Sequence, residues 1–115
     1  MNENKTIVVK WQHERTCICV DEIRYVESYN RHLIFHTGNA TSETVGKLTD
    51  ILSVLQPHGF VRVHQGYIVN MNHIRKFEAD AVVLNDGTRV MTSVRMRSQA
   101  LKEYDRYIGQ VFTVV

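Results

Sequence analysis

The chain has 115 residues, of which 43% are hydrophobic and 23% are charged, a composition typical of one globular domain. Fourteen basic residues against 12 acidic residues give a net charge of +2, which excludes a polycation and a strongly acidic protein. No apolar run is long enough to span a membrane, and the polar first residues hold no apolar signal core. We therefore expect a cytoplasmic protein without membrane insertion.

The first half of the chain predicts short strands joined by tight turns. Two β-rich runs, 7–11 and 16–20, are separated by a polar segment, a pattern typical of a hairpin. A second pair of runs, 24–29 and 32–37, is joined by Asn30-Arg31 and predicts another hairpin.

After these strands the hydrophobic period changes to that of a helix. The pattern predicts an amphipathic helix over 45–56, with Thr44 as its N-cap and Pro57 at its end. The apolar residues at helical spacing are Val45, Leu48, Ile51, Leu52 and Leu55.

Beyond Pro57 the chain again predicts strands, followed by a last helix. Residues 67–70 fit either a strand or a helical turn. The last helix should start near Ser93 as N-cap and turn Leu101, Tyr104 and Ile108 inward. We expect strands over 60–63, 74–78, 81–84 and 89–92, with a tight turn at Asn85-Asp86-Gly87.

Together these elements predict a fold that is mainly β with two helices, one internal and one C-terminal. No repeat, low-complexity tract or linker divides the sequence. We therefore expect one domain over residues 7–108, with terminal extensions over 1–6 and 109–115.

Charge is distributed in blocks along the second half of the chain. Residues 60–77 hold three basic residues and no acid, residues 78–88 hold three acids and no base, and residues 89–115 are basic overall. Arginine and glutamine can hold base edges by paired hydrogen bonds, and a helix start at Ser93 would offer N–H groups to a phosphate. A solvated helix face carries similar charges, so composition alone leaves both interpretations open.

The sequence shows no pattern for a metal, a cofactor or catalysis. His32 and His36 lie in a predicted strand, roughly 13 Å apart, so they cannot share one ion. Cys17 and Cys19 lack the usual zinc spacing and are poorly placed for a disulfide, so we expect two buried thiols. No nucleophile accompanies His64, and no glycine-rich phosphate motif occurs. We predict no metal, no cofactor and no enzymatic activity.

Residues 60–70 resemble the LytTR family of bacterial DNA-binding domains. Phe60, Arg62 and His64 stand on alternating positions, and two polar residues, an apolar run and Val69-Asn70 follow, as in the family's signature. The resemblance extends over nearly the whole chain, through residues 23–28, the helical pattern over 45–55, Ile74, and the Asp86-Gly87 turn before the strand that ends at Ser93.

The resemblance implies an elongated LytTR-type β fold, with short strands in small sheets, whose loops insert into successive major grooves of double-stranded DNA. Members of the family bind direct repeats near promoters, often as two copies per site, and regulate transcription. Most sit behind a phosphorylatable receiver domain, and stand-alone and membrane-linked forms exist.

The resemblance also identifies residues that contact DNA. It places base contacts at Asn30, Arg31, Gln65 and Arg95. The common form of the family has Arg-Ser where this chain has Gln65-Gly66. In the common form the serine is followed directly by the arginine, whereas here Val94 stands between Ser93 and Arg95. The resemblance therefore leaves open which base each residue prefers.

Contacts to the DNA backbone fall within the two basic blocks, and the acidic residues 78–88 should point away from the DNA. Structural alternatives accompany these assignments: His64 could bridge two strands, Gln65 could cap the next turn, and Arg97 could be a solvated helix residue. The residues assigned to backbone contacts are Arg62, His64, Ser93 and Arg97.

Two other classes of protein fit parts of the sequence. An exposed edge strand over residues 7–11 could pair with a protein partner. Tyr25, Tyr29 and Phe35 could instead stack RNA bases, although the spacing of the tyrosines also fits core packing. Salt-sensitive binding of duplex DNA, without binding of single-stranded RNA, would separate these classes.

Overall fold

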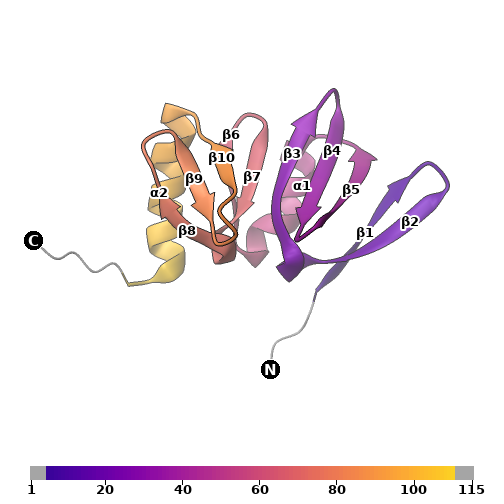
Figure 1. Cartoon of the computed structure of the whole chain (residues 1–115), viewed down its shortest axis with the longest axis horizontal. Helices are drawn as coiled ribbons and strands as arrows, with labels where there is room; N and C mark the ends of the chain where they lie inside the picture. The colour runs from indigo at the N-terminus through magenta and orange to yellow at the C-terminus, as the bar shows by residue number, and fades with distance from the viewer. Residues whose placement is uncertain (1–4, 111–115) are drawn as a thin grey trace, which may run out of the picture.

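The structure is a computed structural model that describes residues 5–110 and measures 55 × 37 × 25 Å along its principal axes. It is mainly β with one internal and one C-terminal α-helix, as the sequence predicts (Figure 1). Its strands are β1 (Thr6–Trp11), β2 (Glu14–Cys19), β3 (Ile23–Tyr29), β4 (His32–Thr37), β5 (Ala40–Val45), β6 (Phe60–His64), β7 (Tyr67–Asn70), β8 (Ile74–Phe77), β9 (Ala81–Leu84) and β10 (Arg89–Met91). Its α-helices are α1 (Leu48–Leu55) and α2 (Val94–Ile108), and short 3-10 turns cover Val20–Glu22, Gln56–His58 and Met71–His73.

The strands form three antiparallel sheets that lie side by side along the long axis (Figure 1). The β1–β2 hairpin lies at one end, and a three-stranded sheet of order β10-β9-β8 lies at the other. Between them is a five-stranded sheet of order β5-β4-β3-β7-β6. The pairing of β3 with β7 brings residues 25–27 beside residues 67–69, so the two sequence motifs become neighbours in space.

Two hydrophobic cores lie on opposite faces of the central sheet. The β1–β2 hairpin and α1 cover one face, and the β8–β10 sheet and α2 cover the other. Because side chains alternate along a strand, Ile68 and Val69 of β7 pack in different cores. β6 divides its residues in the same way, with Phe60 in the first core and Val61 in the second. The central sheet therefore joins both halves of the molecule.

Asn70 ends β7 and is only 1% exposed. Its Nδ2 donates to the carbonyl of Ile23 at 2.9 Å, and its Oδ1 accepts from the backbone N–H of Asn72 at 3.0 Å. Residues 67–70 are therefore a strand whose last side chain caps the following 3-10 turn, which explains why the sequence fitted both a strand and a turn.

The internal helix is shorter than predicted, because α1 begins at Leu48. Val45 belongs instead to β5, a strand that the sequence analysis missed, and its side chain is 62% exposed. Thr44 does not cap the helix, because its hydroxyl donates to the carbonyl of Lys10 at 2.6 Å. The helical spacing of Val45 is thus accidental, since pairing with β4 holds residues 40–45 in a strand.

Two predictions of burial are also wrong. Ile108 lies in the last turn of α2 and is 46% exposed, whereas the residue of α2 that is fully buried is Ala100. Cys17 is exposed and Cys19 is partly exposed, and both thiols are free. The β1–β2 hairpin covers the core with one face only, and Ile18 occupies that face, so its two cysteine neighbours point the other way.

Candidate nucleic-acid interface

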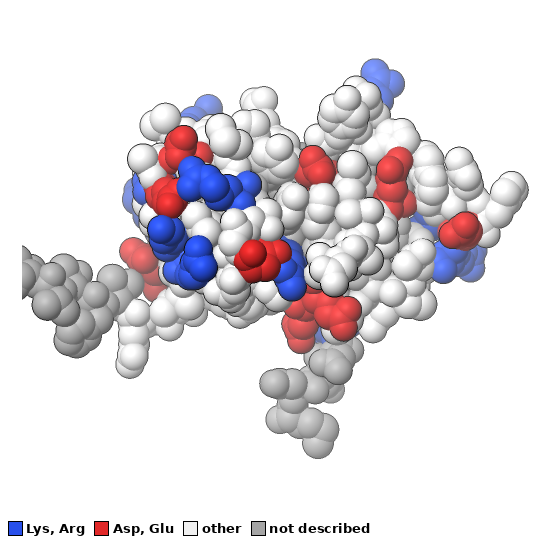
Figure 2. Space-filling model, viewed as in Figure 1, with Lys and Arg blue, Asp and Glu red and all other residues white. Residues whose placement is uncertain are grey.

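Three segments that the sequence analysis singled out meet at one edge of the molecule. The β3–β4 turn, the β6–β7 turn and the beginning of α2 all lie at the upper edge in Figure 1. These segments carry Asn30-Arg31, Gln65 and Arg95, the residues assigned to base contacts. Basic side chains project from the upper outline in Figure 2, above the β3–β4 hairpin and beside the top of α2.

Backbone hydrogen bonds fasten these segments to one another. Ser28 donates to the carbonyl of Gly66 at 2.9 Å, which ties β3 to the β6–β7 turn. Ser93 donates to the carbonyl of Val63 at 3.0 Å, which ties the beginning of α2 to β6. Because main-chain atoms make these bonds, the relative positions of the turns do not depend on the exposed side chains.

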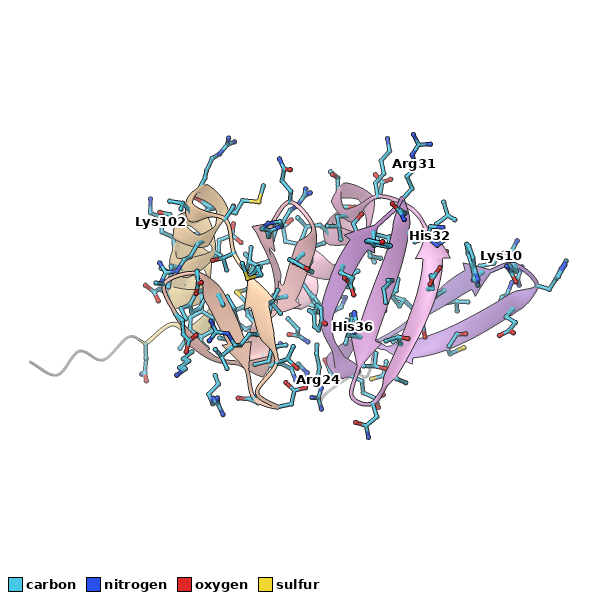
Figure 3. All side chains as sticks on the ribbon, turned by 45° about the horizontal axis from the view of Figure 1, so that its top comes forward. Lys10, Arg24, Arg31, His32, His36 and Lys102 are labelled. Carbon is cyan, nitrogen blue, oxygen red and sulfur yellow. The ribbon has the colours of Figure 1, made fainter. Side chains whose placement is uncertain are left out.

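The β3–β4 turn has the backbone of a tight hairpin. Asn30 and Arg31 have φ angles of 50° and 66°, as in the two-residue turns that suit twisted strands. Asparagine tolerates this left-handed region, but arginine does so only at a cost in energy. The Arg31 side chain is exposed and projects away from the sheet (Figure 3). The turn thus holds a cation in a strained position at the tip of a hairpin.

The β6–β7 turn is held together by two of the residues assigned to phosphate contacts. The guanidinium of Arg62 donates to the carbonyl of Gln65 at 2.6 Å and to that of His64 at 3.3 Å. The backbone N–H of Gly66 donates to Nδ1 of His64 at 3.0 Å, so a neutral His64 carries its proton on Nε2. His64 therefore bonds within its own turn, and its ring also lies against that of Tyr67 on the neighbouring strand, with ring centroids 5.3 Å apart. The Gln65 side chain is exposed at the tip.

The beginning of α2 follows the predicted cap. The Ser93 hydroxyl accepts from the backbone N–H of Met96 at 3.2 Å, as expected of an N-cap. Arg95 is exposed in the first turn, and the adjacent Val94 is 91% exposed. Arg97 is partly buried and donates from Nε to the carbonyl of Glu78 at 2.8 Å. Arg97 is therefore not a solvated helix residue, because it anchors α2 to the β8–β9 turn.

The acidic segment 78–88 does not point away from the candidate interface as a unit. The β9–β10 turn with Asp86 lies at the opposite edge (Figure 1), where Asp86 pairs with Arg24. The β8–β9 turn lies beside the beginning of α2 instead, since the backbone N–H of Thr92 donates to the carbonyl of Asp80 at 3.0 Å. Glu78 in this turn pairs with Lys76 and Arg89.

Hydrogen bonds, together with these ion pairs, lower the pKa of both carboxyl groups. Hydrogen bonds from Lys76 and Arg89 lower the pKa of Glu78. The backbone N–H of Thr88 and the Arg24 guanidinium lower the pKa of Asp86. Both carboxylates are therefore charged at neutral pH, and their basic partners offset that charge.

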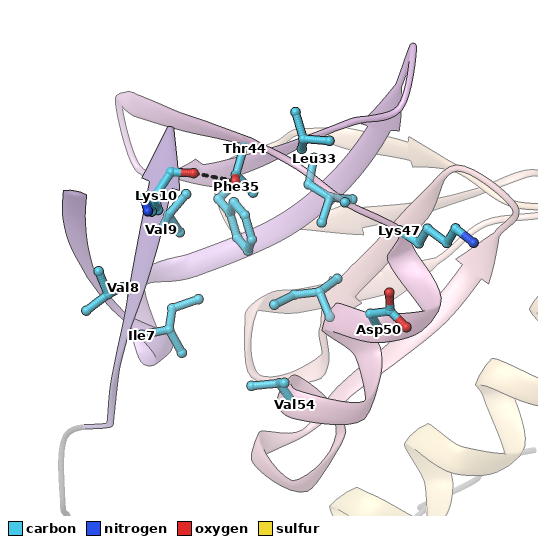
Figure 4. A pocket seen from close by; sticks show the side chains of 13 residues that line it. Ile7, Val8, Val9, Lys10, Leu33, Phe35, Thr44, Lys47, Asp50 and Val54 are labelled. Atoms are coloured by element: carbon cyan, nitrogen blue, oxygen red, sulfur yellow. Dashed lines mark hydrogen bonds between the residues drawn. The ribbon is translucent and has the colours of Figure 1, made fainter. Parts of the chain in front are cut away.

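A hollow lies between the β1–β2 hairpin and α1. It has a volume of about 490 Å³, and its wall is mainly apolar (Figure 4). Ile7 and Val54 point into it from opposite sides, and Phe35 closes it from the central sheet. Among the described strands, β1 pairs with β2 alone, so its other edge faces this groove. β1 contains residues 7–11, the segment that the sequence suggested as an exposed edge strand.

The aromatic residues do not form a surface for stacking RNA bases. Phe35 is 1% exposed and belongs to the first core. Tyr25 stacks on His36, with ring centroids 4.1 Å apart, and of the three residues considered for stacking only Tyr29 is well exposed. Within residues 5–110, no three histidine, cysteine or acidic side chains gather as metal ligands. None of the helices in this range is long and apolar enough to cross a membrane.

These features define a class of protein, a β-rich domain that presents turns and a helix start, and not the side of a helix, at one basic edge. The family model of the LytTr DNA-binding domain matches residues 13–104. The chain therefore belongs to the LytTR family, whose domains bind DNA in bacterial transcription regulation and are not catalytic.

A solved structure has the same fold. It is the LytTr DNA-binding domain of a protein from Bacillus cereus described as a methyl-accepting/DNA response regulator. The TM-score is 0.76 at 20% sequence identity, and the match covers 89% of this chain and 97% of that chain. The comparison with curated proteins found no match.

Proposed function

We propose that this domain recognises a specific sequence in double-stranded DNA by inserting its turns into successive major grooves. The observation that carries the proposal is the single edge on which the β3–β4 turn, the β6–β7 turn and the beginning of α2 are fastened together. Turns held at fixed spacing can meet base edges that recur at fixed spacing along a duplex.

In this arrangement exposed side chains read bases. Arg31 and Arg95 can each hold a guanine edge by two parallel hydrogen bonds, and Gln65 can do the same for adenine. Asn30 lies beside Arg31 at the tip of the same hairpin. None of the three side chains of Arg31, Gln65 and Arg95 is bonded to another of the described residues, so each is available to a base.

Partly buried residues contact the phosphates of the DNA backbone and at the same time stabilise the turns of the protein. His64 uses Nδ1 within the protein, which leaves Nε2–H as a donor to a phosphate. Arg62 and Arg97 each retain guanidinium N–H groups beyond those bonded to carbonyls. Ser93 caps α2, whose first N–H groups are donors suited to an anion.

The wider setting follows from the family. We propose that residues 7–108 act as the DNA-binding domain in the cytoplasm, at direct repeats near promoters, with a second copy on the adjacent repeat. A receiver domain or a membrane-linked regulator outside this sequence would supply the signal.

Selection of bound duplexes from a random pool, followed by titration of the selected sequence, tests the proposal. With about four phosphates neutralised, the plot of log affinity against log salt should have a slope of about −3 to −4 per domain. Single-stranded RNA of the same length is the control and should bind weakly. If no sequence is enriched, or if RNA binds as well as the duplex, sequence-specific reading of duplex DNA by this edge is wrong.

A further inference from the structure

A second hollow, of about 680 Å³, opens at the same edge, between the β3–β4 turn and the β6–β7 turn. It differs from the apolar groove in Figure 4 because its wall carries three basic side chains and no acidic side chain. The charged and polar residues in its wall are Arg31, Lys47, Arg62, Ser28, Thr49 and Gln65.

The three cations in this wall are not equally available. Arg62 turns its guanidinium toward the carbonyls of the β6–β7 turn. Arg31 projects from the hairpin tip, where we have assigned it to a base. Lys47 makes no side-chain hydrogen bond or ion pair with any residue in the described range. Among the described residues that line this hollow, Lys47 is thus the cation that is neither bonded within the protein nor assigned to a base.

The backbone fixes Lys47 at the junction of β5 and α1. It occupies the N-cap position of α1 in an extended conformation, with φ −115° and ψ 142°, and its side chain makes no capping hydrogen bond. The adjacent Gly46 donates its N–H to the carbonyl of Arg31 at 3.2 Å, which ties this junction to the β3–β4 turn. Lys47 lines both hollows, and in Figure 4 its side chain extends away from the apolar groove. Asp50, the acid in the first turn of α1, lines that groove and not the second hollow.

We propose that this hollow binds a backbone phosphate of the DNA, with Lys47 supplying the positive charge and the Thr49 hydroxyl donating a hydrogen bond. The inference rests on the proposed function, because turns that enter two successive major grooves must straddle the phosphates between them. A phosphodiester offers only acceptors and one negative charge, which matches the cations and hydroxyl groups among the residues that line this hollow, none of which is a carboxylate. No side chain caps the beginning of α1, and its first two residues, Leu48 and Thr49, also line the hollow.

The test compares Lys47→Gln with Lys102→Gln, since both remove one exposed lysine and only Lys47 lines the hollow. Lys102 lies on α2, away from the β3–β4 turn that carries Arg31 (Figure 3). At 0.1 M salt, Lys47→Gln should lower affinity for the duplex by about 5- to 10-fold and make the salt slope shallower by about 0.9. Lys102→Gln should change neither quantity, and Lys47→Arg should keep most of the affinity. Thr49→Val should lower affinity by about 2- to 5-fold without changing the slope, because it removes a hydrogen bond and no charge.

The ratio of specific to non-specific binding separates a phosphate contact from a base contact. Lys47→Gln should leave this ratio unchanged, and a fall in the ratio would overturn the phosphate assignment. Equal behaviour of Lys47→Gln and Lys102→Gln would show that the hollow holds no phosphate, although the wild-type protein still binds its selected duplex. Failure of the wild-type protein to select any duplex would instead reject the proposed function itself.

Discussion

The backbone N–H of Ser93 donates a hydrogen bond of 3.0 Å to the carbonyl of Val63, so α2 begins at a fixed distance from the β6–β7 turn. The same turn is tied to β3 through Ser28 and Gly66. Backbone hydrogen bonds therefore fix the segments of the candidate interface relative to one another. The exposed side chains on these segments can thus be substituted one at a time without moving the segments.

Arg95 should contribute more to binding of the selected duplex than to binding of unrelated DNA. A bidentate contact to guanine is worth about 1–3 kcal/mol of discrimination, so Arg95→Ala should compress the ratio of specific to non-specific binding by roughly 5- to 150-fold. Competition titrations with selected and scrambled duplexes measure this ratio. Arg97 is a poor control because it anchors α2 to Glu78, so Lys102→Ala serves better. An unchanged ratio in Arg95→Ala would remove Arg95 from the base contacts.

Arg31 should show a conflict between stability and binding. Its φ of 66° suits glycine, and Asn-Gly is the preferred pair for this kind of turn. Arg31→Gly should therefore raise the free energy of unfolding by about 0.5–1 kcal/mol while weakening duplex binding. Urea unfolding and DNA titration on the same preparation measure both changes. Arg31→Ala keeps the strain and loses the charge, so it should weaken binding without the gain in stability.

Arg62 should act through the shape of its guanidinium as well as through its charge. Lysine cannot reach the carbonyls of His64 and Gln65 together, so Arg62→Lys should loosen the β6–β7 turn although the charge is kept. We expect faster hydrogen exchange at the Gly66 amide and a loss of about 1 kcal/mol in stability. The charge-matched control is Arg95→Lys, which should leave that amide protected. Wild-type exchange in Arg62→Lys would show that the guanidinium does not hold the turn.

Among the polar residues of the central sheet, Asn70 should be the one whose substitution lowers the free energy of unfolding most. Asn70→Ala leaves the carbonyl of Ile23 without its donor and removes the acceptor for Asn72, both near the junction of the two cores. We expect a loss of about 2–4 kcal/mol in the free energy of unfolding, measured in urea. Asn72→Ala, at an exposed site, should cost less than about 1 kcal/mol. Similar losses in both variants would contradict a special role for the buried amide.

Local patterns were enough to predict the fold class and the turns. Tight-turn residues at Asn30-Arg31 and the cap at Ser93 act through their immediate neighbours, so the sequence alone locates them. The beginning of α1 was predicted wrongly because residues 40–45 become a strand only by pairing with β4. The pairing joins two strands through backbone hydrogen bonds, and the hydrophobic spacing around Val45 does not indicate it.

The candidate site was predictable in its position but not in its internal bonds. The family signature identified Arg62 and His64, but their hydrogen bonds to the turn depend on the geometry of the β6–β7 hairpin. Lys47, to which we have assigned a phosphate as a proposal, was not among the predicted contacts because the predicted helix ran through it. The pair Gly46-Lys47 after a β-rich run was the available signal, since glycine weakens a helix at that point.

The division of β7 between two cores limits how the binding specificity of this domain can change. Ile68 and Val69 face opposite sides of the central sheet, and a shift of one residue in this strand would exchange every side chain between the two faces. An inserted residue in the β6–β7 turn that passed into the strand would thus expel Asn70 from its buried site. Engineering of new target sequences should therefore proceed by substitution at Gln65, at constant loop length, whereas insertion or deletion libraries at this turn should yield mostly unfolded protein.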